Sequence, residues 1–288
     1  MSTAVGCRTL HVPDSAQATL IPTWVLYPAE GAEQVVDFGP YPLAVALDAP
    51  MVGQAVPLVV ISHGNGGSPW THRETAVHLV RAGFAVVLLE HPGNGRSDNR
   101  LASTAANLEN RPRHVRLVLD AVLAGLGPQL RGSQVGLIGH SIGAYTALAV
   151  AGGAPMCLPN EAPDGVARPV AVVPDPRIGT LVLLAPAAIW FQAEGALAGV
   201  QCPILLFSGA LDRIAWPGVH AEIVVRGAAR VEHRCVPNAG HFSFQSPFPP
   251  ALNRPDFPPA QDPPGFDRAG FQPILNGAIC AFLRSTLG

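Results

Sequence analysis

The sequence predicts an α/β fold in which a mainly parallel central sheet carries helices on both faces. The first observation is periodicity: short runs rich in Val, Leu and Ile alternate with longer segments whose apolar residues recur every three or four positions. The second is composition, because a chain of 288 residues that is 48% hydrophobic and only 13% charged can bury a large core. No boundary divides the chain, and we expect a single domain over residues 1–288.

Seven apolar segments have the length and composition of strands that are buried on both faces. They are Thr23–Tyr27, Pro57–Ser62, Ala85–Glu90, Gln134–Gly139, Thr180–Leu184, Pro203–Ser208 and Ala229–Val236. Apolar spacing between them predicts helices over Arg73–Ala82, Arg113–Leu126, Ile142–Gly152, Val219–Arg226 and Phe271–Leu287. Two stretches break the alternation and are expected to be loop insertions: residues 153–176, and residues 247–266 with their eight Pro.

The charged residues exclude several classes of function. The formal net charge is -2 and no run of like charge occurs, so nucleic acid is not an expected partner. All 18 basic side chains are Arg, which excludes Schiff-base chemistry, pyridoxal phosphate attachment and the phosphate-binding Lys of P-loop enzymes. No grouping of His, Cys or carboxylates has metal-ligand spacing, and we expect neither a metal nor an organic cofactor.

The cellular location is inferred from the start of the chain and from the cysteines. The first 20 residues contain no basic start followed by an apolar stretch, so no signal peptide is expected. The longest apolar runs, such as Phe84–Leu89, are too short to cross a bilayer. The five cysteines are scattered without a C-x-x-C pair and are expected to be small buried hydrophobes. These features predict a cytoplasmic protein without a membrane span, and they leave its oligomeric state open.

A candidate nucleophile stands at a predicted strand-to-helix junction. The motif Gly139-His140-Ser141-Ile142-Gly143 follows the strand "VGLIG" and begins the helix "IGAYTALAVAG". A serine on such a turn is held in a strained conformation above the sheet, and the two glycines avoid collisions with neighbouring backbone. The alternative is a serine that merely caps the helix.

A serine hydroxyl needs a base, and the base needs a carboxylate to orient it. His241, in "VPNAGHFSF", follows the last predicted strand and is the histidine that fits, whereas His233 lies within that strand as an expected core residue. Asp212, in "LLFSGALDRIAW", follows the preceding strand and so lies at the same edge of the sheet. Asp175 and Asp98 are weaker rivals for the acid.

Acyl transfer also requires donors for the oxygen that becomes negative. The backbone N–H of Ile142 is one candidate. The second is expected in "SHGNGG", a Gly-rich turn at residues 62–67, where we assign it to the N–H of Asn65 with Gly66 as the alternative. Phosphate binding by this turn is disfavoured because no G-K-S/T follows it.

Taken together, the motifs "PLVVISHGNGGS", "GFAVVLLEHPGNGRSD", "LIGHSIGAYTALAVAG", "PILLFSGALD" and "NAGHFSF" resemble the α/β-hydrolase fold in one order along most of the chain. More closely they resemble the dienelactone-hydrolase-like group that includes relatives of platelet-activating factor acetylhydrolase. The resemblance implies Ser141 as nucleophile, Asp212 as acid and His241 as base, with oxyanion donors at Asn65 and Ile142. True dienelactone hydrolases carry Cys where this chain has Ser141, so a dienelactone is not the expected substrate.

The expected function is that of a serine carboxylic-ester hydrolase that forms an acyl-enzyme on a small or medium apolar ester. An amidase, a peptidase or a lactonase would use the same residues, and a non-catalytic binding protein would be indicated by a missing member of the triad. The segment "APAAIWFQAEGALAGVQC" leaves room for only a short excursion, so no large cap domain is expected. Aromatic residues near the predicted loop edges are candidates for a substrate pocket: Trp70, Trp190, Phe191, Trp216 and Phe242.

Overall fold

One twisted sheet organises the molecule in the computed structural model, which describes residues 3–288. Its strands run in the spatial order β10-β9-β8-β7-β5-β6-β2-β1-β4-β3. Their bounds are β1 (Ala4–Asp14), β2 (Thr19–Ala29), β3 (Gln34–Phe38), β4 (Tyr41–Leu47), β5 (Val56–Ser62), β6 (Ala85–Leu89), β7 (Leu130–His140), β8 (Ile178–Leu184), β9 (Ile204–Gly209) and β10 (Val231–Val236).

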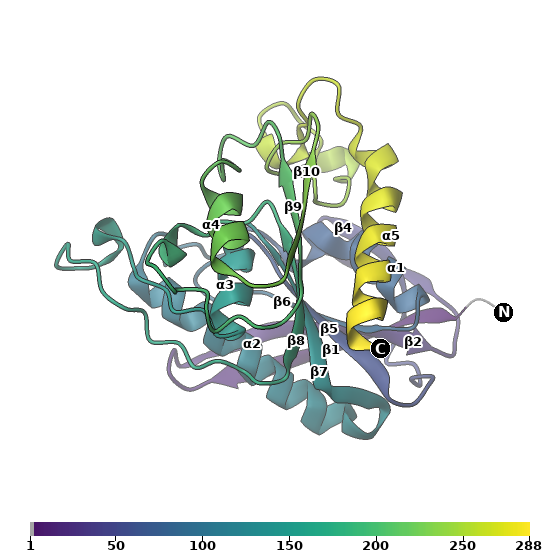
Figure 1. Ribbon diagram of the computed structural model, residues 1–288. Coiled ribbons are helices and arrows are strands. Elements are labelled where there is room, and N and C mark those ends of the chain that lie inside the picture. The colour runs from purple at the N-terminus through teal and green to yellow at the C-terminus, as the bar shows by residue number, and fades with distance from the viewer. Residues whose placement is uncertain (1–2) are drawn as a thin grey trace.

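The predicted mainly parallel sheet is confirmed. The six strands from β10 to β6 pair in parallel, and β2 joins β6 in the antiparallel sense. The helices are α1 (Arg73–Arg81), α2 (Ala105–Leu126), α3 (Ile142–Val150), α4 (His220–Gly227) and α5 (Arg268–Leu287). Helices α1 and α5 cover one face of the sheet, while α2, α3 and α4 cover the other (Figure 1). Each face therefore has its own apolar core.

The N-terminal strands β1, β3 and β4 were not predicted, and they extend the sheet beyond β2. Strand β1 pairs with β2 along its whole length, but exposed polar side chains at Thr9 and His11 interrupt its apolar pattern. Strands β3 and β4 form a hairpin whose two-residue turn is Gly39-Pro40. Gly39 has a φ of 61°, which glycine adopts without steric cost. The Gly-Pro pair at the turn was therefore the feature of the sequence that could have predicted this hairpin.

Helix α2 begins eight residues before its predicted start at Arg113, because Pro112 lies inside the helix rather than before it. Thr104 caps the N-terminus by accepting a hydrogen bond from the N–H of Asn107 at 3.2 Å. Proline has no N–H for the carbonyl of Leu108, and the hydroxyl of Tyr145 in α3 donates to that carbonyl instead at 2.9 Å. A tertiary contact thus replaces the missing helical bond.

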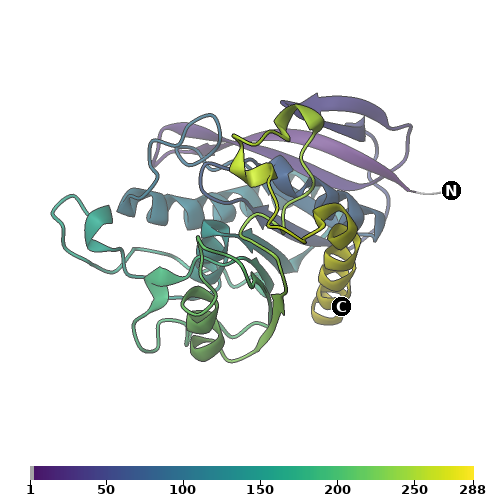
Figure 2. The ribbon, with the colours of Figure 1, turned by 90° about the horizontal axis from the view of Figure 1, so that it is seen from above.

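The connections agree with the expectation of no large cap, because only a short 3-10 helix, Ile189–Phe191, lies between β8 and β9. The segment 153–176 projects beside α2 and α3, whereas the segment 247–266 crosses above the carboxyl ends of the parallel strands (Figures 1 and 2). This second segment contains two short 3-10 helices, Pro250–Leu252 and Pro258–Ala260.

Strand β10 is an edge of the sheet, and it is more exposed than we expected. Its residues Glu232, His233, Arg234 and Cys235 are all exposed, and only the two terminal valines are half-buried. His233 is therefore not a core residue, although its Nε2 lies 2.8 Å from the hydroxyl of Ser208 on β9. Cys235 is exposed for the same reason and Cys202 is half-buried, so the expectation of buried cysteines holds only for the other three.

Candidate active site

Ser141 occupies a sharp turn between β7 and α3. Its φ of 56° and ψ of -122° are strained for a residue with a side chain, as expected for a strand-to-helix elbow. The glycine argument is confirmed: a Cβ on Gly139 would lie 2.2 Å from the carbonyl oxygen of Gly143, and a Cβ on Gly143 would lie 2.1 Å from that of Ser62. Ser141 makes no side-chain cap on α3, so its hydroxyl is directed elsewhere.

The hydroxyl of Ser141 meets a histidine and a carboxylate in line. Its Oγ lies 2.9 Å from Nε2 of His241, and Nδ1 of the same ring lies 2.8 Å from Oδ2 of Asp212. All three residues are buried, with Asp212 only 2% exposed. The structure therefore brings together the three residues that the sequence singled out, on loops after β7, β9 and β10.

Asp212 is fixed as an anion by its surroundings. Burial alone would raise the pKa of its carboxyl, but the contact with His241 and two backbone N–H donors lower that pKa below its ordinary value. The donors are Ile214 and Ala215, each 2.8 Å from Oδ1. The rival carboxylates lie elsewhere, since Asp175 pairs with Arg177 and Asp98 pairs with Arg100.

The Gly-rich turn after β5 passes directly over the elbow. A Cβ on Gly64 would lie 3.3 Å from the Cβ of Ser141 and 3.0 Å from the His140 ring, so a side chain there would crowd the serine. The N–H of Asn65 donates to no protein acceptor within residues 3–288. The N–H of Ile142 opens α3, where no intrahelical acceptor exists for it. Both donors considered from the sequence are thus adjacent to Ser141.

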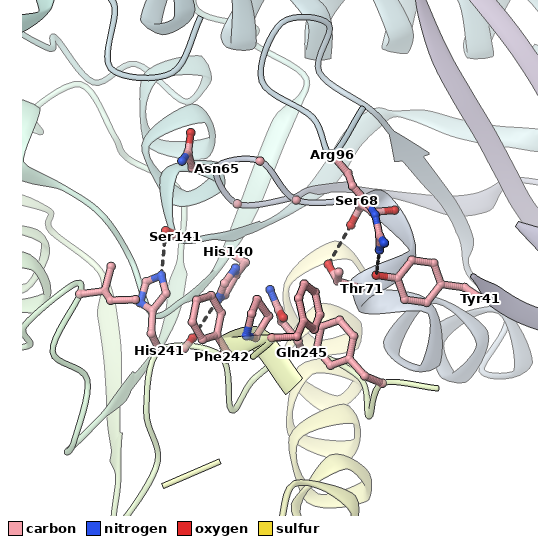
Figure 3. Close-up of a pocket in the computed structure, with 17 residues that line it drawn as sticks. Tyr41, Asn65, Ser68, Thr71, Arg96, His140, Ser141, His241, Phe242 and Gln245 are labelled. Carbon is pink, nitrogen blue, oxygen red and sulfur yellow. Dashed lines mark hydrogen bonds between the residues drawn. The ribbon is translucent and has the colours of Figure 1, made fainter. Parts of the chain in front are cut away.

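A cavity of about 300 Å³ begins at Ser141 and His241 (Figure 3). Aromatic rings of Phe242, Phe248 and Phe257 line it, together with polar groups that include Tyr41, Arg96 and Gln245. The volume is at the lower end of small-molecule pockets. Tyr41 and Arg96 lie at the end of the cavity farther from Ser141 (Figure 3).

Two comparisons agree with this architecture. A family model described as the alpha/beta hydrolase fold matches residues 57–196, which include the Gly-rich turn and the elbow. The solved structure of a ferulic acid esterase from Streptomyces cinnamoneus superposes with a TM-score of 0.74, covering 99% of this chain and 91% of that one at 21% identity. The chain therefore has the α/β-hydrolase fold. At that level of identity, the structural likeness shows the fold alone.

Two curated relatives of this α/β-hydrolase share the name 2-hydroxy-6-oxononadienedioate/2-hydroxy-6-oxononatrienedioate hydrolase 1. The relative from Pseudomonas putida is 33% identical over 100 residues, and that from Dechloromonas aromatica (strain RCB) is 36% identical over 102 residues. Each alignment covers 34% of this chain and 32% of the relative. The match therefore spans about a third of either protein.

The aromatic pocket predicted from the sequence needs correction, because Phe242 is the only one of the five predicted residues that lines the cavity. Trp70 is 3% exposed and stacks on Phe38 with ring centroids 3.9 Å apart, within the core on the α1 side. Trp190 and Phe191 pack against Tyr145, and Trp216 is 62% exposed to solvent. Proximity to a loop edge in sequence did not indicate the direction of these side chains.

A buried polar network lies behind the Gly-rich turn of this α/β-hydrolase, and the sequence did not reveal it. Arg111, fully buried in α2, donates to Asn94, Ser62, Thr146 and the carbonyl of His63. Nδ2 of Asn94 in turn donates to Oδ1 of Asn65 at 2.7 Å. The helical context of "ENRPRH" predicts nothing about such contacts, so this part of the site could not be found without the fold.

Five buried histidines surround the site. Burial, with the charge of Arg111 as a second cause, lowers the pKa of His63 to about 3. Burial also lowers the pKa of His72 to about 4 and that of His91 and His140 well below the ordinary value. The pKa of His114 is lowered to about 3, mainly by burial. These rings are therefore neutral at physiological pH.

His140 supports the candidate base directly. Its Nε2 lies 2.9 Å from the carbonyl oxygen of His241, and its ring lies 5.1 Å from the His241 ring. His72 lies behind it, with ring centroids 5.3 Å apart. Neutral rings avoid placing a second positive charge beside His241 when that residue takes up a proton.

No helix within residues 3–288 combines the length and the apolarity that a membrane crossing requires.

Proposed function

We propose that this α/β-hydrolase is a serine carboxylic-ester hydrolase that works through an acyl-enzyme. The observation that carries the proposal is the continuous series Ser141 Oγ, His241 and Asp212, with contacts of 2.9 Å and 2.8 Å. Such distances allow direct proton transfer from a hydroxyl to an imidazole that a carboxylate orients. The esterase named above, as a structural neighbour, supports the same class of chemistry.

The residues would act in two half-reactions. Ser141 Oγ attacks the ester carbonyl while Nε2 of His241 takes its proton, and the same ring then protonates the leaving alcohol. Water next attacks the acyl-enzyme, again with His241 as base, and releases the acid. The N–H groups of Asn65 and Ile142 would bind the oxyanion of both tetrahedral intermediates. Asp212 would hold the imidazole in the required tautomer and stabilise the imidazolium.

The cavity favours a small or medium substrate with an apolar portion, because Phe242, Phe248 and Phe257 form much of its wall. The residues do not distinguish an ester from an amide or a lactone. A second candidate reaction comes from the two curated relatives, whose name assigns them the hydrolysis of 2-hydroxy-6-oxononadienedioate. It ranks second because each match covers 32% of the relative.

The decisive test is Ser141→Ala, assayed with 4-nitrophenyl butyrate, a matched anilide, a lactone and 2-hydroxy-6-oxononadienedioate. Loss of the nucleophile is expected to lower kcat by more than about a thousandfold, with an unchanged circular dichroism spectrum. Fluorophosphonate should label the wild type at Ser141 and leave the variant unlabelled. Retention of ester turnover by the variant would refute the assignment, and a preference for another substrate would replace the ester.

A further inference from the structure

Arg111 carries a positive charge that no carboxylate neutralises. Its side chain is fully buried, and its four hydrogen-bond partners are neutral oxygens. No Asp or Glu of residues 3–288 lies close enough to support its ionisation, and burial lowers its pKa to about 9. A guanidinium buried in this way is expensive, because hydrogen bonds to neutral groups offset only part of the lost hydration. A purely structural role would be met at lower cost by an uncharged side chain.

The contacts of Arg111 reach both segments that would supply oxyanion donors. On the turn after β5, it donates to the hydroxyl of Ser62 at 3.2 Å and to the carbonyl of His63. Through Asn94, 2.6 Å from its Nη1, it also holds the side chain of Asn65.

The second segment is the first turn of α3. Nε of Arg111 donates to the hydroxyl of Thr146 at 2.9 Å, and that hydroxyl donates to the carbonyl of Ile142 at 3.1 Å. One guanidinium therefore connects the Gly-rich turn after β5 with the first turn of α3, the two segments next to Ser141.

The histidines next to Arg111 are neutral and add no second positive charge. His63 and His91 are held neutral by burial first and by the charge of Arg111 second. His114 lies farther along the same cluster, with its Nδ1 3.1 Å from that of His91. The carboxylate beyond it, Asp14, is paired with Arg113 on the other side of the cluster. The cluster thus presents a single fixed positive charge behind the Gly-rich turn.

We propose that Arg111 is a positioning residue that aligns the two oxyanion donors and whose unpaired charge favours the anionic tetrahedral intermediate. The inference rests on the proposed function. When the bond between Ser141 Oγ and the carbonyl carbon forms, the π electrons of the carbonyl move to its oxygen and the serine proton moves to His241. The new negative charge is created in front of a cation that is already in place, so no reorganisation is needed at that moment.

The test is a kinetic comparison of Arg111→Gln and Arg111→Lys with 4-nitrophenyl butyrate. We expect Arg111→Gln to lower kcat on the order of a hundredfold while KM changes by less than about threefold. Arg111→Lys should recover at least about tenfold of that loss, because lysine restores the charge although it loses the planar fork. A merely structural role predicts that both variants are equally impaired.

A matched control is Arg113→Gln, which removes a charge from the same helix two residues away. Arg113 is paired with Asp14, and we expect kcat within about threefold of wild type. A second readout is inhibition by phenylboronic acid, which binds a catalytic serine as a tetrahedral anion. Its Ki should rise in Arg111→Gln in proportion to the loss of kcat, because both report the anionic state.

Asn94→Asp provides a test that keeps Arg111 in place, in case Arg111→Gln does not fold. The new carboxylate would form an ion pair with the guanidinium and would no longer donate to Asn65, and we expect kcat to fall by at least about tenfold. A kcat within about threefold of wild type in Arg111→Gln, or in Asn94→Asp if the former is unfolded, overturns the inference and leaves the proposed function standing. An inactive wild type that fluorophosphonate does not label overturns both.

Discussion

The two proline-containing excursions of this α/β-hydrolase, 153–176 and 247–266, have opposite relations to the cavity. The first follows the C-terminal end of α3, and the whole of that helix separates it from Ser141. None of its residues lines the cavity. The second begins six residues after His241 and contributes Phe248, Phe257 and Pro259 to the cavity wall. Both segments are rich in Pro, but only the second contains Phe, and it departs from the fold beside the candidate base. Its position and its aromatic residues together make it the excursion that forms the cavity wall.

The means by which each excursion is held also differ. In 153–176, the buried carboxylate of Glu161 accepts from the indole N–H of Trp190 at 2.8 Å and from the N–H of Leu158 at 2.7 Å. In 247–266, the buried Arg268 donates to Asp262 at 2.9 Å and to the carbonyl of Pro259 at 2.9 Å. Arg73 of α1 donates to the carbonyl of Pro247. Arginines thus fix the backbone of the cavity segment and leave its phenylalanines free to shape the wall.

The largest effect expected is a global loss of stability in acid, which should reach both excursions although they pack against opposite faces of the sheet. His63 and His72 have lowered pKa values in the folded state, about 3 and about 4, whereas the unfolded chain titrates near 6.5. Below pH 6.5 the unfolded state binds more protons, so the free energy of unfolding falls as the pH falls. Each of the two residues is expected to cost about 2 kcal/mol at pH 5.

Urea unfolding at pH 7.5 and pH 5, followed by hydrogen exchange, measures this loss. Exchange in 153–176 and 247–266 should accelerate together, and exchange in only one of them would show that the excursions open independently. The double variant His63→Gln with His72→Gln should flatten the pH dependence if it folds. A stability that does not change between the two pH values would contradict the prediction.

A smaller effect is expected from Glu161→Leu, which should act on stability alone. The substitution leaves the buried indole N–H of Trp190 without an acceptor, at an expected cost of about 2 kcal/mol in the free energy of unfolding. Relative kcat/KM values across a series of ester lengths should stay within about twofold. The double variant Glu161→Leu with Trp190→Phe removes the stranded donor and should recover part of the stability. A changed ester preference would show that 153–176 communicates with the cavity.

The reverse pattern is expected from Phe257→Ala in the second excursion. Phe257 lines the cavity and meets Phe248 edge-on with ring centroids 5.4 Å apart, so its removal widens the wall. The ratio of kcat/KM for a bulky ester to that for an acetyl ester should rise by about tenfold. Phe266→Ala is the matched control within the same excursion, because Phe266 packs on Phe271 and does not line the cavity. If the ratio of kcat/KM values is the same in Phe257→Ala and Phe266→Ala, Phe257 does not limit the size of the substrate.

The smallest effect is expected from Trp216→Ala. Trp216 is 62% exposed and lies outside the cavity lining, so the free energy of unfolding should change by less than about 0.5 kcal/mol. Ester kinetics should also remain at the wild-type level for short and bulky esters. A marked rise in KM for bulky esters alone would place Trp216 in an extended binding surface and restore the expectation drawn from the sequence.

Ser141, Asp212 and His241 could be predicted because each of them follows a recognisable strand of the parallel sheet. Ser141 follows a buried strand between glycines whose Cβ atoms would collide with backbone, and this local geometry leaves a clear signature. Asp212 and His241 follow successive parallel strands, so topology alone brings them to one edge. What could not be predicted depends on side-chain direction across the core: Trp70 turns into the α1 layer, and Arg111 reaches the Gly-rich turn from another helix.

The exposed edge formed by β10 has a consequence for how molecules meet in concentrated solution. An unpaired edge strand offers free backbone donors and acceptors to any other strand, which is a common beginning of aggregation. In β10 the exposed positions include Glu232 and Arg234, whose charged groups contact each other at the surface. A second strand docking there would have to strip water from both charges. The last strand of the parallel sheet is thus protected against extension of the sheet into a neighbouring molecule.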